Sequence, residues 1–231
     1  MSNVRIRQIY YSPIQIGMLD NEWVPYHNKD KVTPFFENNV FKKLYLEKDH
    51  NRSDYYGIFS SKFFNKHNKT GSDLNRFMVQ DEYQHDIYSF FGGKQLDHSK
   101  QVNTFLDTYH PHLLEIGCKL IKTLFSEDLT TLKADRIYYN HWAAKSYIFD
   151  GYCKEMLLPA MDLLNGELKE LAWKDSKYKE GYNMNLELAG IMNEQKCIEA
   201  WGVPYYPHHA FVLERLPSIY FALKGYTIRQ L

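Results

Sequence analysis

The sequence lacks a net charge and any long apolar run. Its 231 residues include 28 Lys and Arg against 28 Asp and Glu, a formal net charge of zero. This balance argues against a protein that binds nucleic acid or an anionic membrane by bulk electrostatics. No stretch approaches the roughly 20 apolar residues of a membrane span, and the first residues show no signal-peptide core. We expect no transmembrane segment, while peripheral association with a membrane remains open.

Cysteine is also scarce. Cys118, Cys153 and Cys197 are far apart and odd in number, whereas a secreted disulfide scaffold has an even, dense set. We therefore expect reduced thiols in a cytoplasmic protein.

Several common motifs are missing. The chain contains no GxGxxG and no GxxxxGK[ST], the glycine-rich sequences that cradle dinucleotides and nucleotide phosphates. It also contains no GxSxG and no HExxH. These absences disfavour a nicotinamide enzyme and a P-loop kinase.

Aromatic residues are abundant: 19 Tyr, 14 Phe and 4 Trp make up 16% of the chain. A tyrosine offers a flat face and a hydroxyl, which suits sugars and nucleobases. An AT-rich genome would give the same enrichment, so aromatic content alone does not decide the function.

Hydrophobic periodicity predicts strands that alternate with helices. Expected strands cover residues 4–11, 55–60, 85–91 and 136–140, and expected helices cover 38–46, 72–79, 106–124, 142–164, 187–201 and 208–223. We expect Pro159 to interrupt or cap the fourth helix, and Pro217 to kink the last one. The alternation predicts an α/β fold with a mostly parallel central sheet flanked by helices and a helical C-terminal half. No repeat or linker divides the chain, so we expect a single domain over residues 1–231.

In such sheets the ligand lies beyond the carboxyl ends of the strands. The pattern places polar and aromatic residues at these ends, namely Tyr11, Ser12, Ser60, Lys62, Asp86, Tyr88, Asn140 and His141. We interpret Asp86, in an otherwise apolar strand, as a ligand of a ribose or of a divalent cation, because a carboxylate there needs a partner. A solvated strand end is the alternative. Lys62 could meet a phosphate, although a surface lysine is the default.

Histidines cluster at two places. His110 and His112 flank a proline, and His208 precedes His209. The sequence supplies no third metal ligand beside them. A general base is the better role for His209 because imidazole titrates near neutral pH. Glu214, in an apolar helix beside Arg215, forms a structural ion pair or binds a ligand.

A series of segments in order resembles small bacterial GT-A-like glycosyltransferases of capsule and O-antigen assembly. The segments cover residues 9–13 (IYYSP), 24–28 (VPYHN), 54–63 (DYYGIFSSKF), 69–71 (KTG), 85–90 (HDIYSF), 109–111 (YHP), 137–142 (IYYNHW) and 209–216 (HAFVLERL). Two departures stand out. Tyr88 occupies the second place of the Asp-x-Asp-like element, and no aromatic residue separates Ser60 and Ser61 from Lys62.

The resemblance implies a Rossmann-like nucleotide-binding fold and a nucleotide-sugar donor lying over the carboxyl ends of the strands. Tyr11 or Tyr26 would stack on the base, backbone near Gly57 would pack against it, and Ser12, Ser60 and Tyr88 would lie around the donor. Asp86 would hold the ribose or a Mn²⁺ or Mg²⁺ ion, and Lys62 would offset the charge of the departing diphosphate.

The resemblance also places a glycan or lipid-linked saccharide acceptor near Asn140, Trp142 and His110. If the reaction inverts the anomeric centre, His209, His110 or an unidentified carboxylate would take the acceptor proton, with Glu214 as a further catalytic candidate. Two alternatives stay open. One is a metal-dependent hydrolase that uses the histidine clusters, and the other is a non-catalytic glycan- or protein-binding module.

Overall fold

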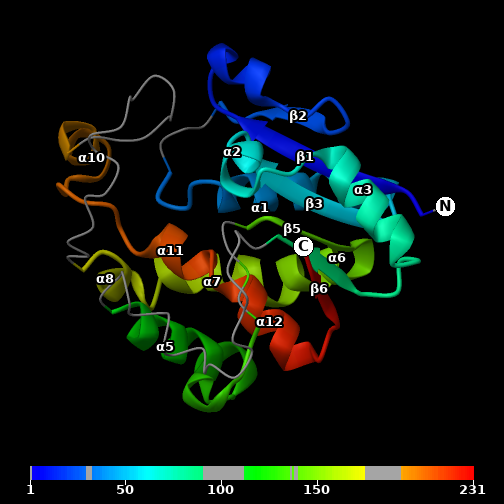
Figure 1. Cartoon of the computed structure of the whole chain (residues 1–231). Coiled ribbons are helices and arrows are strands. Elements are labelled where there is room, and N and C mark those ends of the chain that lie inside the picture. The colour runs from blue at the N-terminus through cyan, green and yellow to red at the C-terminus, as the bar shows by residue number, and fades with distance from the viewer. Residues whose placement is uncertain (1, 30–32, 91–111, 136, 138–139, 175–193) are drawn as a thin grey trace.

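A six-stranded sheet forms the centre of the computed structural model, which describes residues 2–29, 33–90, 112–135, 137, 140–174 and 194–231 (Figure 1). Its strands are β1 (Val4–Tyr10), β2 (Val24–His27), β3 (Tyr55–Ser60), β4 (Ile87–Ser89), β5 (Trp142–Lys145) and β6 (Ile228–Gln230). The strand order is β2-β1-β3-β5-β4-β6. β1 is parallel to β2 and β3, and β4 is parallel to β6, while β5 is antiparallel to both β3 and β4. Five strands therefore share one direction and β5 opposes them, which confirms a mostly parallel sheet.

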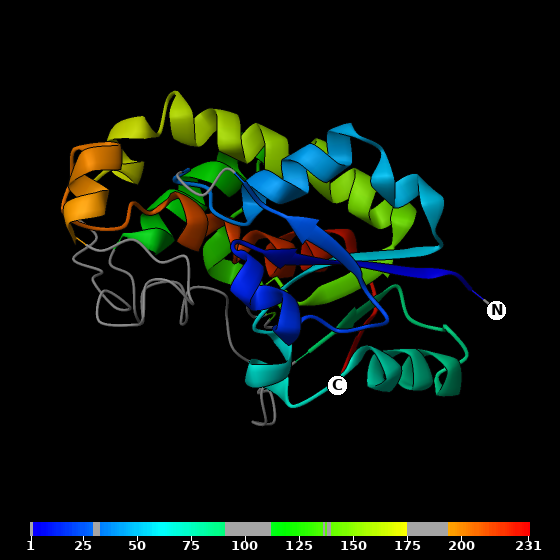
Figure 2. The same ribbon diagram turned by 90° about the horizontal axis from the view of Figure 1, so that it is seen from above.

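Helices cover both faces of the sheet (Figure 2). α2 (Phe63–His67) and α3 (Gly71–Gln80) pack on one face, against side chains that include Ile6, Phe59 and Tyr88. α1 (Asn38–Leu46), α6 (Ser146–Tyr152), α7 (Leu158–Asn165) and α12 (Leu216–Lys224) pack on the other. The remaining described helices are α5 (Leu113–Phe125), α8 (Lys169–Ala172), α10 (Glu194–Trp201) and α11 (His209–Leu213), with short helical segments η1 (Pro13–Met18), η2 (Asp49–Arg52), η3 (Leu129–Thr131) and η4 (Cys153–Leu157).

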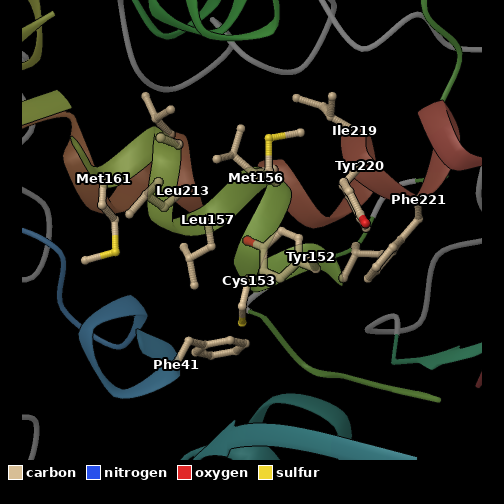
Figure 3. Close-up of a cluster of buried hydrophobic side chains, with 14 of the residues drawn as sticks. Phe41, Tyr152, Cys153, Met156, Leu157, Met161, Leu213, Ile219, Tyr220 and Phe221 are labelled. Atoms are coloured by element: carbon tan, nitrogen blue, oxygen red, sulfur yellow. The ribbon is translucent and has the colours of Figure 1, made fainter. Parts of the chain in front are cut away.

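The larger part of the core lies on the α1 face. Figure 3 shows Phe41 of α1 below the helix that carries Tyr152, Cys153, Met156 and Leu157, with α11 and α12 beside it. All of these side chains are buried, and each large apolar side chain removed from water contributes roughly 1.5–3 kcal/mol. This apolar layer holds α1 in place, and with it the polar residues at the start of that helix.

A buried ion cluster joins β1 to η2. Asp49, whose side chain is 4% exposed, accepts hydrogen bonds from Arg5, Arg7 and the hydroxyl of Tyr56. Burial alone would raise the pKa of Asp49, but these hydrogen bonds hold it well below its usual value. The two arginines lie on the sheet face that α1 covers, so Asp49 compensates two charges that are partly removed from water.

Several predicted elements are confirmed. α1 and β3 have the predicted bounds of 38–46 and 55–60, and β1 ends one residue before the predicted end. Pro217 lies in the first turn of α12, so the predicted kink is a full break between α11 and α12. Most of the predicted strand 136–140 and residue 91 of the third predicted strand lie outside the described residues. Residues 106–111 of the predicted helix 106–124 and residues 187–193 of the predicted helix 187–201 lie outside them as well.

Other expectations are wrong. Residues 142–145 form β5 and not a helix, and the helix begins at Ser146. Ala143 and Ala144 pair with both β3 and β4, so the ladder overrides the local helix preference of alanine. The helix predicted over 72–79 begins one residue earlier, at Gly71, and Thr70 caps it through a reciprocal bond with Asp73. β2 and α2 are absent from the predicted strands and helices.

Candidate active site

The carboxyl edge of the sheet collects polar side chains from several elements. Tyr11 follows β1, Ser60 ends β3, and Lys62 lies between β3 and α2. His141 precedes β5, which starts at this edge because it runs the opposite way. The carboxyl edge of a largely parallel sheet is where α/β proteins bind their ligands.

A charged cluster spans this edge. Glu37, at the start of α1, has its Oε1 3.4 Å from the hydroxyl of Tyr11. Lys62 and Lys66, from the opposite face of the sheet, act electrostatically on Glu37, as does Glu214 at the end of α11. Tyr11, Glu37, Lys62, Lys66 and Glu214 therefore form one electrostatic group, called here the edge cluster.

The charges of the edge cluster perturb one another. Burial raises the pKa of Glu37, and the negative charge of Glu214 raises it further, while Lys66 and Lys62 oppose the rise. Burial lowers the pKa of Lys66, and Glu37 and Glu214 oppose that shift. Lys62 and Lys66 are four residues apart, where like charges repel on a helix. The two glutamates balance this repulsion, so the cluster brings two cations and two carboxylates together.

A chain of hydrogen bonds lies beside the edge cluster. The backbone N–H of Ser60 donates to Nε2 of His141 at 3.4 Å, and the Ser60 hydroxyl is 3.0 Å from the same atom. Nε2 is therefore an acceptor, the ring proton lies on Nδ1, and Nδ1 of His141 donates to Nε2 of His67 at 2.6 Å. Burial lowers the pKa of His67 to about 4 and that of His141 well below its usual value, and the charge of Lys66 adds to both shifts.

This chain fixes the orientation of the Ser60 hydroxyl. Because the hydroxyl donates its proton to a neutral His141, its lone pairs are the acceptors that Ser60 offers to a ligand. Gln8 supports the same strand end, since its Nε2 donates to the carbonyl of Ser60 at 3.2 Å and its Oε1 accepts from the backbone N–H of Asp20.

The structure brings four of the predicted site residues together: Tyr11, Ser60, Lys62 and Glu214. Ser12 lies next to Tyr11 and precedes η1. Glu214 pairs with Arg215 at 3.0 Å, so the predicted ion pair is confirmed and reaches the edge cluster through its negative charge. Asn140 is buried just before His141, with a φ of 57°. His110 lies outside the described residues.

Asp86 was expected at the carboxyl edge, and this position is wrong. It immediately precedes β4, at the amino edge, where its Oδ1 accepts from Lys145 and its Oδ2 accepts from the backbone and hydroxyl of Thr227. Burial alone would raise the pKa of Asp86, but these bonds lower it. Both oxygens are engaged, and no group of three His, Cys, Asp or Glu suited to a metal occurs among the described residues. Asp86 thus does not fit a divalent cation.

Other predicted residues serve packing. Tyr88 is buried and donates to Asp81 at 2.6 Å. Trp142 is fully buried in the core. Gly57 lies where a Cβ would be 2.7 Å from the carbonyl oxygen of Trp142, so it permits the approach of β5 to β3. Tyr26, on the outer strand β2, is partly buried against the same core.

His209 is also enclosed. It has no exposed surface and lies between the rings of Phe35 and Trp173. Burial lowers its pKa to about 4. A side chain enclosed in this way does not reach an acceptor, so the geometry does not favour His209 as the general base.

Sequence reasoning missed Glu37, Lys66 and His67. A predicted helix at α2 would have put Lys62 and Lys66 on one face, which is the one local signal for the lysine pair. Glu37 and His67 meet their partners 26 and 74 residues away, and nothing in the local sequence marks such contacts.

A recess of about 330 Å³ lies at the opposite, amino edge of the sheet, lined by Tyr55, Tyr83, Tyr147, Asp54, Lys145 and Ser2. It is shallow and open. We place the candidate site at the carboxyl edge because acids, bases and lysines of complementary charge converge there.

Comparisons with known proteins give a fold and no family. No family model matches the chain, and no curated protein matches it in sequence. Among solved structures, the chain is similar to the apo structure of the WbbM bifunctional glycosyltransferase, with a TM-score of 0.57 and 13% identity over 99% of its length. It spans 44% of the WbbM chain. This protein is therefore a mixed α/β protein similar in fold to a glycosyltransferase.

None of the helices described in the structure is long and apolar enough to cross a membrane.

Proposed function

We propose that the protein is a glycosyltransferase that moves a sugar from a nucleotide-sugar donor to a glycan or lipid-linked saccharide acceptor. The observation that carries the proposal is the edge cluster: at the edge where this kind of sheet binds ligands, Tyr11 contacts Glu37, and two lysines and Glu214 act electrostatically on Glu37. The fold similarity to a glycosyltransferase supports the same reading.

The donor would bind through residues of the edge. Tyr11 offers an aromatic face for the base, next to Ser12, and Tyr26 lies on the neighbouring strand. Lys62 and Lys66 would bind the diphosphate and offset the charge that develops on it as the sugar leaves. Ser60, oriented by His141, would accept a hydrogen bond from a hydroxyl of the donor.

Finer points of the proposal come from the sequence resemblance. They are a GT-A-type fold over residues 1–231, a role in capsule or O-antigen synthesis, a cytoplasmic location and peripheral contact with a membrane. A Mn²⁺ or Mg²⁺ ion brought by the donor diphosphate stays a prediction, and so does an acceptor near His110, Asn140 and Trp142.

The test is a thermal-shift screen of UDP-, GDP-, CMP- and dTDP-sugars, each with and without Mn²⁺. A donor present at about 100 times its Kd adds about 2.7 kcal/mol. For a domain of 231 residues this corresponds to a rise in Tm of roughly 5–11 °C. Release of nucleoside diphosphate from the same donor separates an enzyme from a binding module. If no donor shifts a cooperative transition, the proposal is refuted.

A pair of lysine variants locates the donor. Lys66→Met should weaken the binding of the best donor by about 10-fold or more, because it removes one of the two cations of the edge cluster that are assigned to the diphosphate. Lys69→Met, three residues further on and likewise exposed, changes a lysine that is not among the charges acting on Glu37; it is the matched control and should bind the donor as the wild type does. Equal binding by both variants would place the diphosphate elsewhere.

A further inference from the structure

Resting on the proposed function, we propose that Glu37 is the general base that takes the proton of the acceptor hydroxyl, and that the transfer inverts the anomeric carbon. From the sequence, the general base could be His209, His110 or an unidentified carboxylate. The edge cluster narrows this choice to Glu37.

Glu37 has the position that a base requires. It is partly exposed at the carboxyl edge, and its carboxylate lies in the same electrostatic group as the two lysines assigned to the diphosphate. Within the described residues, the hydroxyl of Tyr11 is its hydrogen-bond partner, at a long 3.4 Å to Oε1. That weak contact positions the carboxylate and leaves acceptor capacity on both oxygens.

The competing groups are engaged or enclosed. Glu214 accepts from Arg215 at 3.0 Å, which holds its carboxylate as an ion-pair partner. His209 has no exposed surface. Nε2 of His141 already accepts from Ser60, and the charge of Lys66 opposes its protonation. Burial and the charge of Glu214 both favour the protonated form of Glu37, and a raised proton affinity makes a carboxylate a better base.

The chemical step balances within the site. The acceptor oxygen attacks the anomeric carbon while its proton passes to a carboxylate oxygen of Glu37. The bond from the anomeric carbon to the phosphate oxygen breaks, and its electron pair leaves with the nucleoside diphosphate, whose charge Lys62 and Lys66 offset. Glu37 then loses the proton to water. One base and one displacement place the new bond opposite the old one, so the configuration inverts.

The stereochemistry of the wild type tests the inference directly. The probe is the nucleoside-diphosphate sugar that gives the largest shift in the thermal screen, with water as the acceptor. Proton NMR within minutes, before mutarotation, identifies the anomer released first. We expect the opposite configuration to that of the donor. Release of the retained anomer would overturn the inference while leaving the glycosyltransferase proposal intact, whereas a donor that does not bind would refute both.

A variant pair tests the residue. Glu37→Gln should lower the turnover of that donor by about 10²–10⁴-fold, the range for loss of a general base, with its thermal shift by the donor unchanged. Glu47→Gln, exposed at the end of the same helix α1, should keep the wild-type rate. The rate of the wild type should rise with pH as Glu37 ionises. This rise on the acid side of the pH–rate profile should be absent in Glu37→Gln. A loss of less than about 5-fold, or an unchanged rise with pH in that variant, would reject Glu37 as the base.

Discussion

Replacing Asp49 with asparagine should destabilise the protein by about 3 kcal/mol. Oδ1 of Asp49 accepts from one nitrogen each of Arg5 and Arg7, and Oδ2 accepts from a second nitrogen of each and from the hydroxyl of Tyr56. An asparagine of the same size keeps one acceptor oxygen and turns an NH₂ group toward guanidinium donors. At least two charge-assisted bonds are therefore lost, at about 1.5–3 kcal/mol each.

This range agrees with the roughly 3–5 kcal/mol lost when one partner of a buried ion pair is removed. The lower end applies because the arginine side chains are 22% and 15% exposed, so water partly compensates them. For a domain of this length, about 3 kcal/mol lowers Tm by roughly 6–12 °C. Urea and thermal unfolding measure both quantities.

The pH dependence gives a second check on Asp49. Its folded-state pKa is lowered from the unfolded value of 3.8, so the stabilisation is present in full above that value and shrinks as pH falls below it. The stability gap between wild type and Asp49→Asn should narrow below about pH 4. The matched control is Asp150→Asn, which changes an exposed partner of His50 and should cost no more than about 0.5 kcal/mol. A loss below about 1 kcal/mol for Asp49→Asn would refute this account of the cluster.

Two further predictions concern the elements that frame the site. Gly57→Ala should cost about 3 kcal/mol in urea unfolding, because the new Cβ would lie 2.7 Å from the carbonyl oxygen of Trp142; unchanged stability would show that β5 can move away. Thr70→Ala should cost about 1 kcal/mol, because it removes the side-chain acceptor for the backbone N–H of Asp73 at the start of α3. Thr70→Ser keeps that oxygen and should retain most of the stability, and a loss equal to that of the alanine variant would contradict the capping role.

The sequence predicted the elements whose patterns are local. α1 and β3 are found because each carries an uninterrupted apolar pattern between turn residues. β2 was missed because Pro25 interrupts its pattern, and proline is tolerated there since β2 lies at the edge of the sheet. β5 was missed because its two alanines favour a helix locally, while its central position between β3 and β4 decides otherwise.

The site residues likewise divide into those that local sequence marks and those that it does not. Tyr11, Ser60 and Lys62 could be predicted because each follows a strand, and the carboxyl-edge rule needs no more than the strand ends. Asp86 was assigned to the wrong end of its strand: it is the second residue of the predicted strand 85–91 and immediately precedes β4, which begins at Ile87, so it lies at the amino edge with either set of bounds. Glu37 and Lys66 could not be predicted, because they lie on helices from opposite faces and meet beyond the end of the sheet.

The charge balance of the edge cluster ties donor binding to the proposed base. The lysines that lower the pKa of Glu37 are those assigned to the diphosphate. A bound diphosphate adds negative charge and shares these cations, so it should raise the pKa of Glu37 beyond its value in the free protein. The acid side of the pH profile of kcat reports the pKa of Glu37 in the donor complex, and that of kcat/KM reports its pKa in the free enzyme. The midpoint of the rise in kcat should therefore lie at higher pH than the midpoint of the rise in kcat/KM. Coincident midpoints would mean that the lysines which act on Glu37 are not those which bind the donor.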